Sequence, residues 1–258
     1  MDVLRSLVIA FACFSKIPMP RVDWREQSMR YCMCFFPLIG LVIGLCLWVW
    51  AWLCGALGFG SVLRGAGIAL LPLAVTGGIH MDGFADVVDA QSSHAEPDRK
   101  RQILKDPHTG AFAIIGVASY LLSYAALATE LATGWRVCLL LACLHWMSRC
   151  TSGVATVAFP RSGKTGMLAA FGDSAQKRVC LAVLAAEWLA GAAVMLWASL
   201  PVGAGMALAC ALALACLHRF AMTQFNGMSG DLAGFLLQVA ELAMLACLVV
   251  LGRLVMLA

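Results

Sequence analysis

Long apolar runs separated by short polar stretches dominate the hydropathy pattern of this 258-residue chain. A transmembrane helix needs about 20 mostly apolar residues. Seven runs reach or approach that length, and they cover residues 33–58, 62–80, 111–132, 137–158, 179–199, 201–218 and 232–251. The second run is interrupted by Pro72 and by Gly77 and Gly78, and the sixth is short and begins at Pro201. The pattern predicts an all-α, polytopic integral membrane helical bundle of about seven spans.

A shorter apolar run lies in the first residues, "MDVLRSLVIAFACFSKIPMP", and is closed by Pro18 and Pro20. About a dozen apolar residues are too few to cross a bilayer. The run carries little charge, and no small-residue cleavage site of the kind that ends a signal peptide follows it. We therefore expect an amino-terminal helix that is interfacial or re-entrant.

Composition supports a membrane protein. The chain is 62% hydrophobic and only 12% charged, whereas soluble domains contain about 25% charged residues. No polar stretch is long enough to fold by itself, so we expect a single integral-membrane domain over residues 1–258. The formal net charge is only +4, and the basic residues are mixed with acidic ones, which argues against nucleic acid as a partner.

The basic residues also orient the predicted spans. With seven alternating spans, thirteen of the 18 Lys and Arg residues fall on one side and three on the other. Because loops rich in Lys and Arg remain in the cytoplasm, the first side is expected to be cytoplasmic. This topology brings three polar stretches to the same side, namely residues 81–110, 159–178 and 219–231.

Three aspartates lie in the stretch "GGIHMDGFADVVDA" at residues 77–90. Asp82, Asp86 and Asp89 are spaced i, i+4, i+7, which places them on one face of an α-helix. Like charges on one face repel each other, so a cation is expected beside them, and Mg²⁺ or Mn²⁺ suits carboxylate ligands. The alternative is a solvated face neutralised by the basic residues at 99–101. Charge at the edge of a membrane is unfavourable and usually functional, which favours the metal site.

Other candidate residues flank these aspartates. His80 could act as a base or as a metal ligand. In "KDPHTGAF", a turn before the next span holds Lys105 as a candidate phosphate contact and Asp106 as a candidate base. The alternative for this turn is an ordinary loop that leads into a helix.

The other two polar stretches add cations and one carboxylate. In "FPRSGKTGMLAAFG", Arg161 and Lys164 lie among glycines and could hold phosphate oxygens. Ala158 occupies the position of the first glycine of a P-loop, so this is not a Walker A motif. In "NGMSGDLAG", Asp231 is a candidate metal or ribose contact, or a helix N-cap.

These blocks, in this order, resemble the cobalamin synthase family, also called adenosylcobinamide-GDP ribazoletransferase. The aspartate stretch is similar to the family pattern G-G-x-H-x-D-G-x-A-D-x-x-D, and "FSKIPMP", "FFPLIGLVIG", "KDPHTGAF", "RSGKTGM" and "NGMSGD" resemble its other blocks over nearly the whole chain. Ala90, Ala113 and Asn226 stand where the family usually has glycine. None of these departures removes a carboxylate, and they concern only the local geometry of the loops.

The resemblance implies an enzyme of the prokaryotic inner membrane with its active site facing the cytoplasm. Its reaction would join α-ribazole, or α-ribazole 5′-phosphate, to adenosylcobinamide-GDP, which yields adenosylcobalamin or its 5′-phosphate and GMP. Mg²⁺ held by Asp82, Asp86 and Asp89 would bind the pyrophosphate. Asp89, Asp106 or His80 would take the proton of the attacking hydroxyl. The lipid bilayer is an expected partner, and the alternatives for protein partners are a homo-oligomer and an association with other cobalamin-pathway enzymes.

Two other functions use similar residues. A CDP-alcohol phosphatidyltransferase-like phospholipid synthase also clusters aspartates in a membrane helix, but its motif is D-G-x-x-A-R, whereas here Asp86 directly follows Ala85 and no Arg follows. A cation-coupled transporter could use the aspartates as an ion site, although such residues are expected nearer the middle of the membrane.

Overall fold

The computed structural model describes residues 2–163 and 167–257, and their regular secondary structure is helical apart from one isolated β-bridge. The helices in chain order are α1 (Asp2–Phe14), α2 (Glu26–Met29), α3 (Cys32–Ala56), α4 (Ser61–Thr76), α5 (Ile79–Ser92), α6 (Pro97–Ile103), α7 (Ala111–Thr129), α8 (Trp135–Ala158), α9 (Met167–Ser174), α10 (Lys177–Ala198), α11 (Leu200–Phe225) and α12 (Gly230–Leu257). The all-α fold is confirmed.

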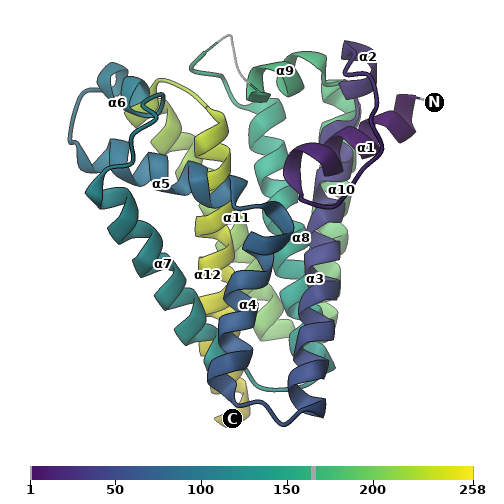
Figure 1. Ribbon diagram of the computed structural model, residues 1–258. Helices are drawn as coiled ribbons and strands as arrows, with labels where there is room; N and C mark the ends of the chain where they lie inside the picture. Colours follow the sequence, from purple (N-terminus) through teal and green to yellow (C-terminus); the bar gives the residue numbers. More distant parts are fainter. Residues whose placement is uncertain (1, 164–166, 258) are drawn as a thin grey trace.

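Six of these helices, namely α3, α7, α8, α10, α11 and α12, are long and apolar enough to cross a membrane. They correspond to six of the seven predicted runs, and α11 extends to Phe225, well beyond the run predicted at 201–218. The remaining run, 62–80, is broken into α4 and α5, whose axes are bent by 100°. The bundle therefore has six spanning helices, or seven spans if the bent pair counts as one. In Figure 1 the long helices run together and α5 crosses them near one end.

The bend between α4 and α5 follows from Gly77 and Gly78. Their φ angles are 66° and 78°, in the left-handed region that residues with a Cβ rarely adopt. The amide of Gly78 donates to the carbonyl of Leu73 at 3.1 Å, which closes the end of α4. The backbone amide of Lys16 donates to Val75 at 2.7 Å, so the segment after α1 covers the bend. The glycine pair thus turns the aspartate-bearing helix out of the direction of the bundle.

The amino-terminal helix α1 is only 13 residues long, and it packs against α3 at the end of the bundle that also carries α2 (Figure 1). The hydroxyl of Ser6 donates to the carbonyl of Ser28 at 2.7 Å and ties α1 to α2. Helix α1 is not among the helices that are long and apolar enough to cross a membrane. This agrees with the short interfacial or re-entrant helix expected from the sequence.

A buried ion pair joins α8 to α12 inside the bundle. The Arg149 guanidinium binds the Glu241 carboxylate, and Nδ1 of His145 lies 2.9 Å from the same carboxylate. Arg149 is only 1% exposed and Glu241 only 2%. The Ser152 hydroxyl, one turn further along α8, donates to the Ala233 carbonyl at 3.1 Å. These contacts fix the rotation of α8 and α12 relative to each other, and therefore the side chains that they present above the ion pair.

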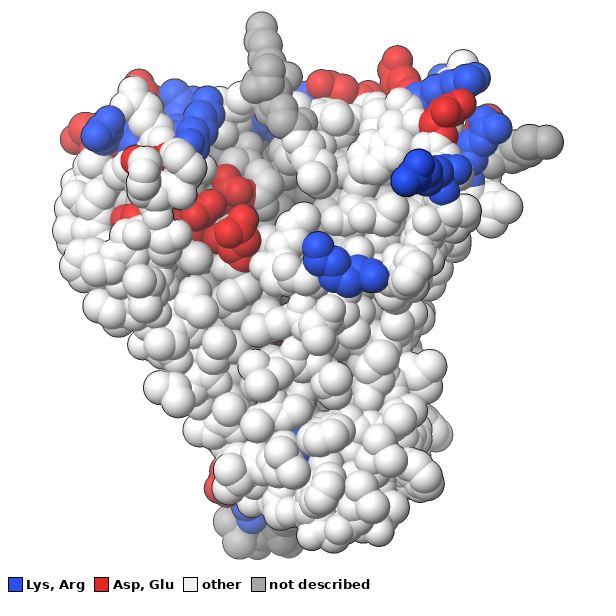
Figure 2. All heavy atoms as spheres, viewed as in Figure 1, with Lys and Arg blue, Asp and Glu red and all other residues white. Residues whose placement is uncertain are grey.

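Charged side chains gather at one end of the molecule. In Figure 2 most Lys and Arg residues lie at the end that carries α6 and α9, a group of carboxylates lies in a hollow just below them, and the middle of the visible face is uncharged. The predicted polar stretches 81–110, 159–178 and 219–231 contribute α5, α6, α9 and the loop before α12 to this end. The topology inferred from the sequence therefore agrees with the structure in bringing these stretches together.

Candidate active site

A cavity of about 710 Å³ opens at the charged end, between α5, α8, α12 and the loops beside them. Its size lies in the range of roughly 300–1,000 Å³ typical of small-molecule sites. The charged and hydroxyl-bearing lining residues are Asp82, Asp98, Arg101, Lys105, Ser152, Thr156, Ser162, Ser229 and Asp231. The apolar lining includes Phe14, Met33, Phe36, Met167 and Phe171.

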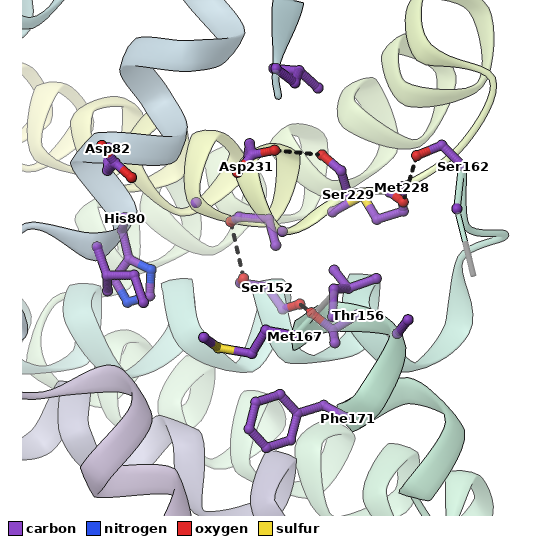
Figure 3. Close-up of a pocket in the computed structure, with 18 of the residues that line it drawn as sticks. His80, Asp82, Ser152, Thr156, Ser162, Met167, Phe171, Met228, Ser229 and Asp231 are labelled. Atoms are coloured by element: carbon purple, nitrogen blue, oxygen red, sulfur yellow. Dashed lines mark hydrogen bonds between the residues drawn. The ribbon is translucent and has the colours of Figure 1, made fainter. Parts of the chain in front are cut away.

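Asp82 on α5 and Asp231 at the start of α12 line one edge of the cavity. Asp86, one turn further along α5, lies outside the lining but is coupled electrostatically to both. The three carboxylates Asp82, Asp86 and Asp231 are called the acidic edge below. Two glycines bring the helices together. A Cβ at Gly83 would lie 2.8 Å from Asp231 Cα, and one at Gly234 would lie 2.9 Å from the His80 carbonyl oxygen. Figure 3 shows Asp82 and Asp231 on the same side of the cavity. The small residues next to the aspartates thus allow the backbones of α5 and α12 to touch.

The acidic edge carries unbalanced negative charge. Asp86, on the crossing helix α5, has its pKa raised to about 6, first by burial and then by the charges of Asp82, Asp231 and Asp89. The only described side chain that donates to Asp231 is Ser229, whose hydroxyl is 3.4 Å from the carboxylate. A bound cation would reverse this repulsion and return Asp86 to its ionised form.

Two of the predicted carboxylates lie elsewhere. The Asp89 carboxylate packs against Gly110, at the start of α7, and Asp89 does not line the cavity. Asp106 is exposed, and its carboxylate lies 2.7 Å from Nδ1 of His108. Asp106 therefore contacts a neighbouring loop residue and also lies outside the cavity lining.

The predicted cationic residues also differ in whether they line the cavity. Lys105 lines the cavity. Arg161 binds the Asp173 carboxylate and donates to the Ala169 carbonyl at 2.9 Å, so it anchors α9 and does not line the cavity. Its neighbours Ser162 and Gly163 do line it. Lys164 falls outside the residues that the structure describes.

Arg101, which the sequence indicated only as a neutralising charge, lines the cavity. Its guanidinium donates to Asp98 at 2.8 Å and to the Ser162 carbonyl at 2.9 Å, so it links α6 to the glycine-rich loop. Arg101 lies in the last turn of α6, and Lys105 lies in the turn that directly follows this helix. Their closeness along the chain was the available signal for a second cation in the site.

The two glycine-rich loops meet beside the cavity. The Ser162 amide donates to Met228 at 3.0 Å, and the Met228 amide donates to Pro160 at 2.8 Å, as a short parallel bridge. Asn226 adopts a φ of 54°, a left-handed conformation that Asn tolerates better than other residues with a Cβ. Its side-chain amide also donates to Asp98 at 3.0 Å. Asn can therefore replace the family's usual glycine here without changing the turn.

The side of the cavity opposite the acidic edge is aromatic. Phe14 contacts Phe36 and Phe171 with ring centroids 4.6 and 5.4 Å apart, and His80 stacks on Phe14 at 6.2 Å and meets Phe36 edge-on at 5.6 Å. Burial lowers the pKa of His80 to about 3. The imidazole is therefore neutral and is a weak base in this setting.

The donor chemistry of the acidic edge fits a hard divalent ion. Its ligands would be carboxylate oxygens from Asp82 and Asp86, which suit Mg²⁺ or Mn²⁺ rather than Zn²⁺ or Cu²⁺. Within residues 2–163 and 167–257, no three His, Cys, Asp or Glu side chains are already arranged as metal ligands. Rotation of the side chains alone changes the separation of carboxylates on neighbouring helices.

Comparison with known proteins identifies the family of this chain. The family model described as cobalamin-5-phosphate synthase matches residues 6–249. An adenosylcobinamide-GDP ribazoletransferase of Lachnoclostridium phytofermentans is 38% identical over 246 residues, which cover 94% of this chain and 92% of that protein. Enzymes of the same name from Ectopseudomonas mendocina and Clostridium botulinum (strain Alaska E43) are 35% identical over 93% of this chain and 96% of that protein, and 31% identical over 96% and 98%, respectively. No solved structure matches. The chain therefore belongs to the cobalamin-5-phosphate synthase family.

Proposed function

We propose that this protein is an adenosylcobinamide-GDP ribazoletransferase that works at the cytoplasmic face of the inner membrane. A hydroxyl of α-ribazole, or of α-ribazole 5′-phosphate, attacks the phosphorus attached to the cobinamide. A new phosphate ester forms, the bond to the bridging pyrophosphate oxygen breaks, and GMP leaves. Because α-ribazole 5′-phosphate would keep its phosphate in the product, the attacking group must be a hydroxyl on the ribose ring.

The observation that carries this proposal is the pairing of an acidic edge with two cations around one cavity. Asp82 and Asp231 line the cavity, with Asp86 one turn behind Asp82 on α5, and Arg101 and Lys105 line it as well. This combination suits a pyrophosphate, whose oxygens need cations, and a hydroxyl that must lose a proton.

Each group then has a distinct task. Asp82 and Asp86 would hold Mg²⁺, which supplies charge stabilisation for the pyrophosphate and the leaving GMP. Lys105 and Arg101 bind phosphate oxygens directly. Asp231 accepts the proton of the attacking hydroxyl, because it is the other carboxylate of the acidic edge that lines the cavity. Asp89, Asp106 and Arg161 receive no substrate contact in this arrangement, since they do not line the cavity.

Neither alternative function is supported by an observation of this structure. The phospholipid synthase motif is absent from the sequence, and the carboxylates lie at one end of the bundle rather than in its middle. A transporter would instead predict uptake into vesicles without release of GMP.

Membranes that contain the protein test the proposal when they are incubated with adenosylcobinamide-GDP, α-ribazole and Mg²⁺. GMP and adenosylcobalamin should appear in equal amounts, as followed by chromatography. The same reaction with α-ribazole 5′-phosphate reports which nucleoside is preferred. If no cobalamin product forms with either nucleoside, the proposed function is wrong.

A further inference from the structure

The cavity has two chemically different sides. Asp82, Asp231, Arg101 and Lys105 supply charge, whereas the aromatic wall, defined as Phe14, Phe36, His80 and Phe171, is uncharged. In Figure 3, Met167 and Phe171 lie across the cavity from Asp231 and Ser229, with Ser152 between them, and His80 lies at one side below Asp82. A ligand that occupies the whole cavity must therefore be ionic at one end and apolar at the other.

The aromatic wall is continuous and comes from four separate segments. Phe14 ends α1, Phe36 belongs to α3, His80 begins α5 and Phe171 belongs to α9. Their ring centroids lie 4.6 to 6.2 Å apart, which is the separation at which aromatic rings pack favourably. A planar aromatic group in the cavity could extend this packing.

His80 is the one member of the wall whose side chain can form hydrogen bonds, and its imidazole forms none with a described residue. Nε2 is buried without a partner, and no described side chain or backbone group bonds Nδ1. The residue is only 6% exposed. Buried polar atoms are nearly always paired, so an unpaired imidazole in the wall of a cavity indicates that the ligand supplies its partner.

We infer that the aromatic wall binds the base of α-ribazole and that His80 hydrogen-bonds the free ring nitrogen of that base. The base of α-ribazole is a dimethylbenzimidazole, which is planar and apolar and has a single ring nitrogen left free once the other carries the ribose. One unpaired imidazole matches one such nitrogen. The ribose and the pyrophosphate then extend toward the charged side, and the inference rests on the proposed function.

The guanine of GDP fits the same wall poorly. Its edge carries an amino group, a ring N–H and a carbonyl, and the phenylalanines of the wall cannot pair with them. Polar groups that are buried without partners are strongly unfavourable. The guanine is therefore assigned to the outer, charged side of the cavity, and His80 acts as a specificity-determining residue for the nucleoside.

Two nucleosides of the same shape test this inference. The riboside of dimethylindole has a C–H in place of the free nitrogen of dimethylbenzimidazole. Both ribosides are compared in the wild type, in His80→Phe, which keeps the ring and removes the hydrogen bond, and in His80→Gln, which restores a side chain capable of bonding. His218→Phe is the matched control, because His218 packs on Phe159 and does not line the cavity. The KM values for the riboside and for adenosylcobinamide-GDP are measured separately.

The wild type and His218→Phe should have a KM for the indole riboside about tenfold higher than for α-ribazole, the factor that corresponds to one hydrogen bond. His80→Phe should treat the two ribosides alike, with an unchanged KM for adenosylcobinamide-GDP, and His80→Gln should recover part of the preference. An active wild type that does not distinguish the ribosides, or a His80→Phe variant that still does, would overturn the inference and leave the proposed function intact. A wild type that forms no cobalamin product would refute the proposed function itself.

Discussion

Two carboxylates on the same helix, Asp231 and Glu241 of α12, have opposite surroundings. Glu241 is buried in the bundle and bonded by Arg149 and Ser148, with His145 2.9 Å away. Asp231 faces the carboxylates of Asp82 and Asp86 and, within the described residues, receives one hydroxyl at 3.4 Å. The fold therefore neutralises the buried charge of Glu241, whereas the charge of Asp231 at the cavity has no positive partner among the described residues. The difference indicates that an external cation completes the second site.

The largest expected effect comes from breaking the neutralised pair. Glu241→Gln leaves the Arg149 charge buried without a counterion, and loss of one partner of a buried pair destabilises a protein by about 3–5 kcal/mol. Thermal unfolding of the detergent-solubilised protein should show a clearly lower Tm. Replacement of both partners by apolar residues, Arg149→Met with Glu241→Leu, should recover most of the loss. An unchanged Tm in Glu241→Gln would show that the pair does not hold α8 and α12 together.

Replacement of carboxylates by amides in the acidic edge should have the opposite effect on thermal stability. Asp82→Asn with Asp86→Asn relieves repulsion, so Tm should be equal to or above that of the wild type. The rate of GMP release should fall at least about 100-fold, because the metal site contributes several kcal/mol to stabilisation of the transition state. Asp106→Asn is the control, since Asp106 lies outside the cavity, and it should retain the wild-type rate. Full activity in the double variant would refute the assignment of the metal ligands.

The close approach of α5 and α12 is open to a smaller perturbation. Gly83→Ala places a Cβ 2.8 Å from Asp231 Cα, which forces the helices apart and moves Asp82 from Asp231. We expect kcat/KM to fall about tenfold, since small displacements of positioned groups slow catalysis. Gly55→Ala in α3 is the matched control, because a Cβ there meets no atom within 4 Å. Equal activity in the two variants would show that this helix contact does not position the site.

The smallest expected effect is a dependence of metal binding on pH. The raised pKa of Asp86, about 6, means that its charge is lost as the pH falls through 6. Because metal ligands must be deprotonated, Mn²⁺ or Mg²⁺ affinity measured by calorimetry should be about tenfold weaker at pH 5 than at pH 7. Asp86→Asn should bind more weakly at pH 7 and lose much of this dependence. A wild-type affinity that does not change over this interval would contradict the description of Asp86.

The spanning helices were predictable because each depends on a long local run of apolar residues. The aspartate face was predictable for the same reason, since Asp82, Asp86 and Asp89 lie within one short helix. The 100° bend at Gly77 and Gly78 was visible in the sequence as an interruption, but its angle depends on the left-handed φ of both residues and on packing of the segment around Lys16.

Contacts between residues far apart in the sequence determine which candidate residues line the cavity. Asp89 and Arg161 were plausible site residues by type, but Asp89 turns toward α7 and Arg161 is bound to Asp173 on α9. Arg101 enters the cavity because its bond to Ser162 joins α6 to a loop that is 61 residues away in sequence. Neither kind of contact leaves a local pattern, so residue type and spacing alone overestimated some candidates and missed another.

The Mg²⁺ dependence of GMP release tests the central claim most directly. Membranes treated with EDTA are supplied with adenosylcobinamide-GDP, α-ribazole and increasing Mg²⁺, in the wild type and in Asp86→Asn. A metal site at the acidic edge predicts no GMP without Mg²⁺ and full recovery in the wild type when Mg²⁺ is restored. Asp86→Asn should need at least a tenfold higher Mg²⁺ concentration for the half-maximal rate, a shift typical of a weakened metal site. GMP release that persists in EDTA, or identical Mg²⁺ curves for the two proteins, would contradict this metal site.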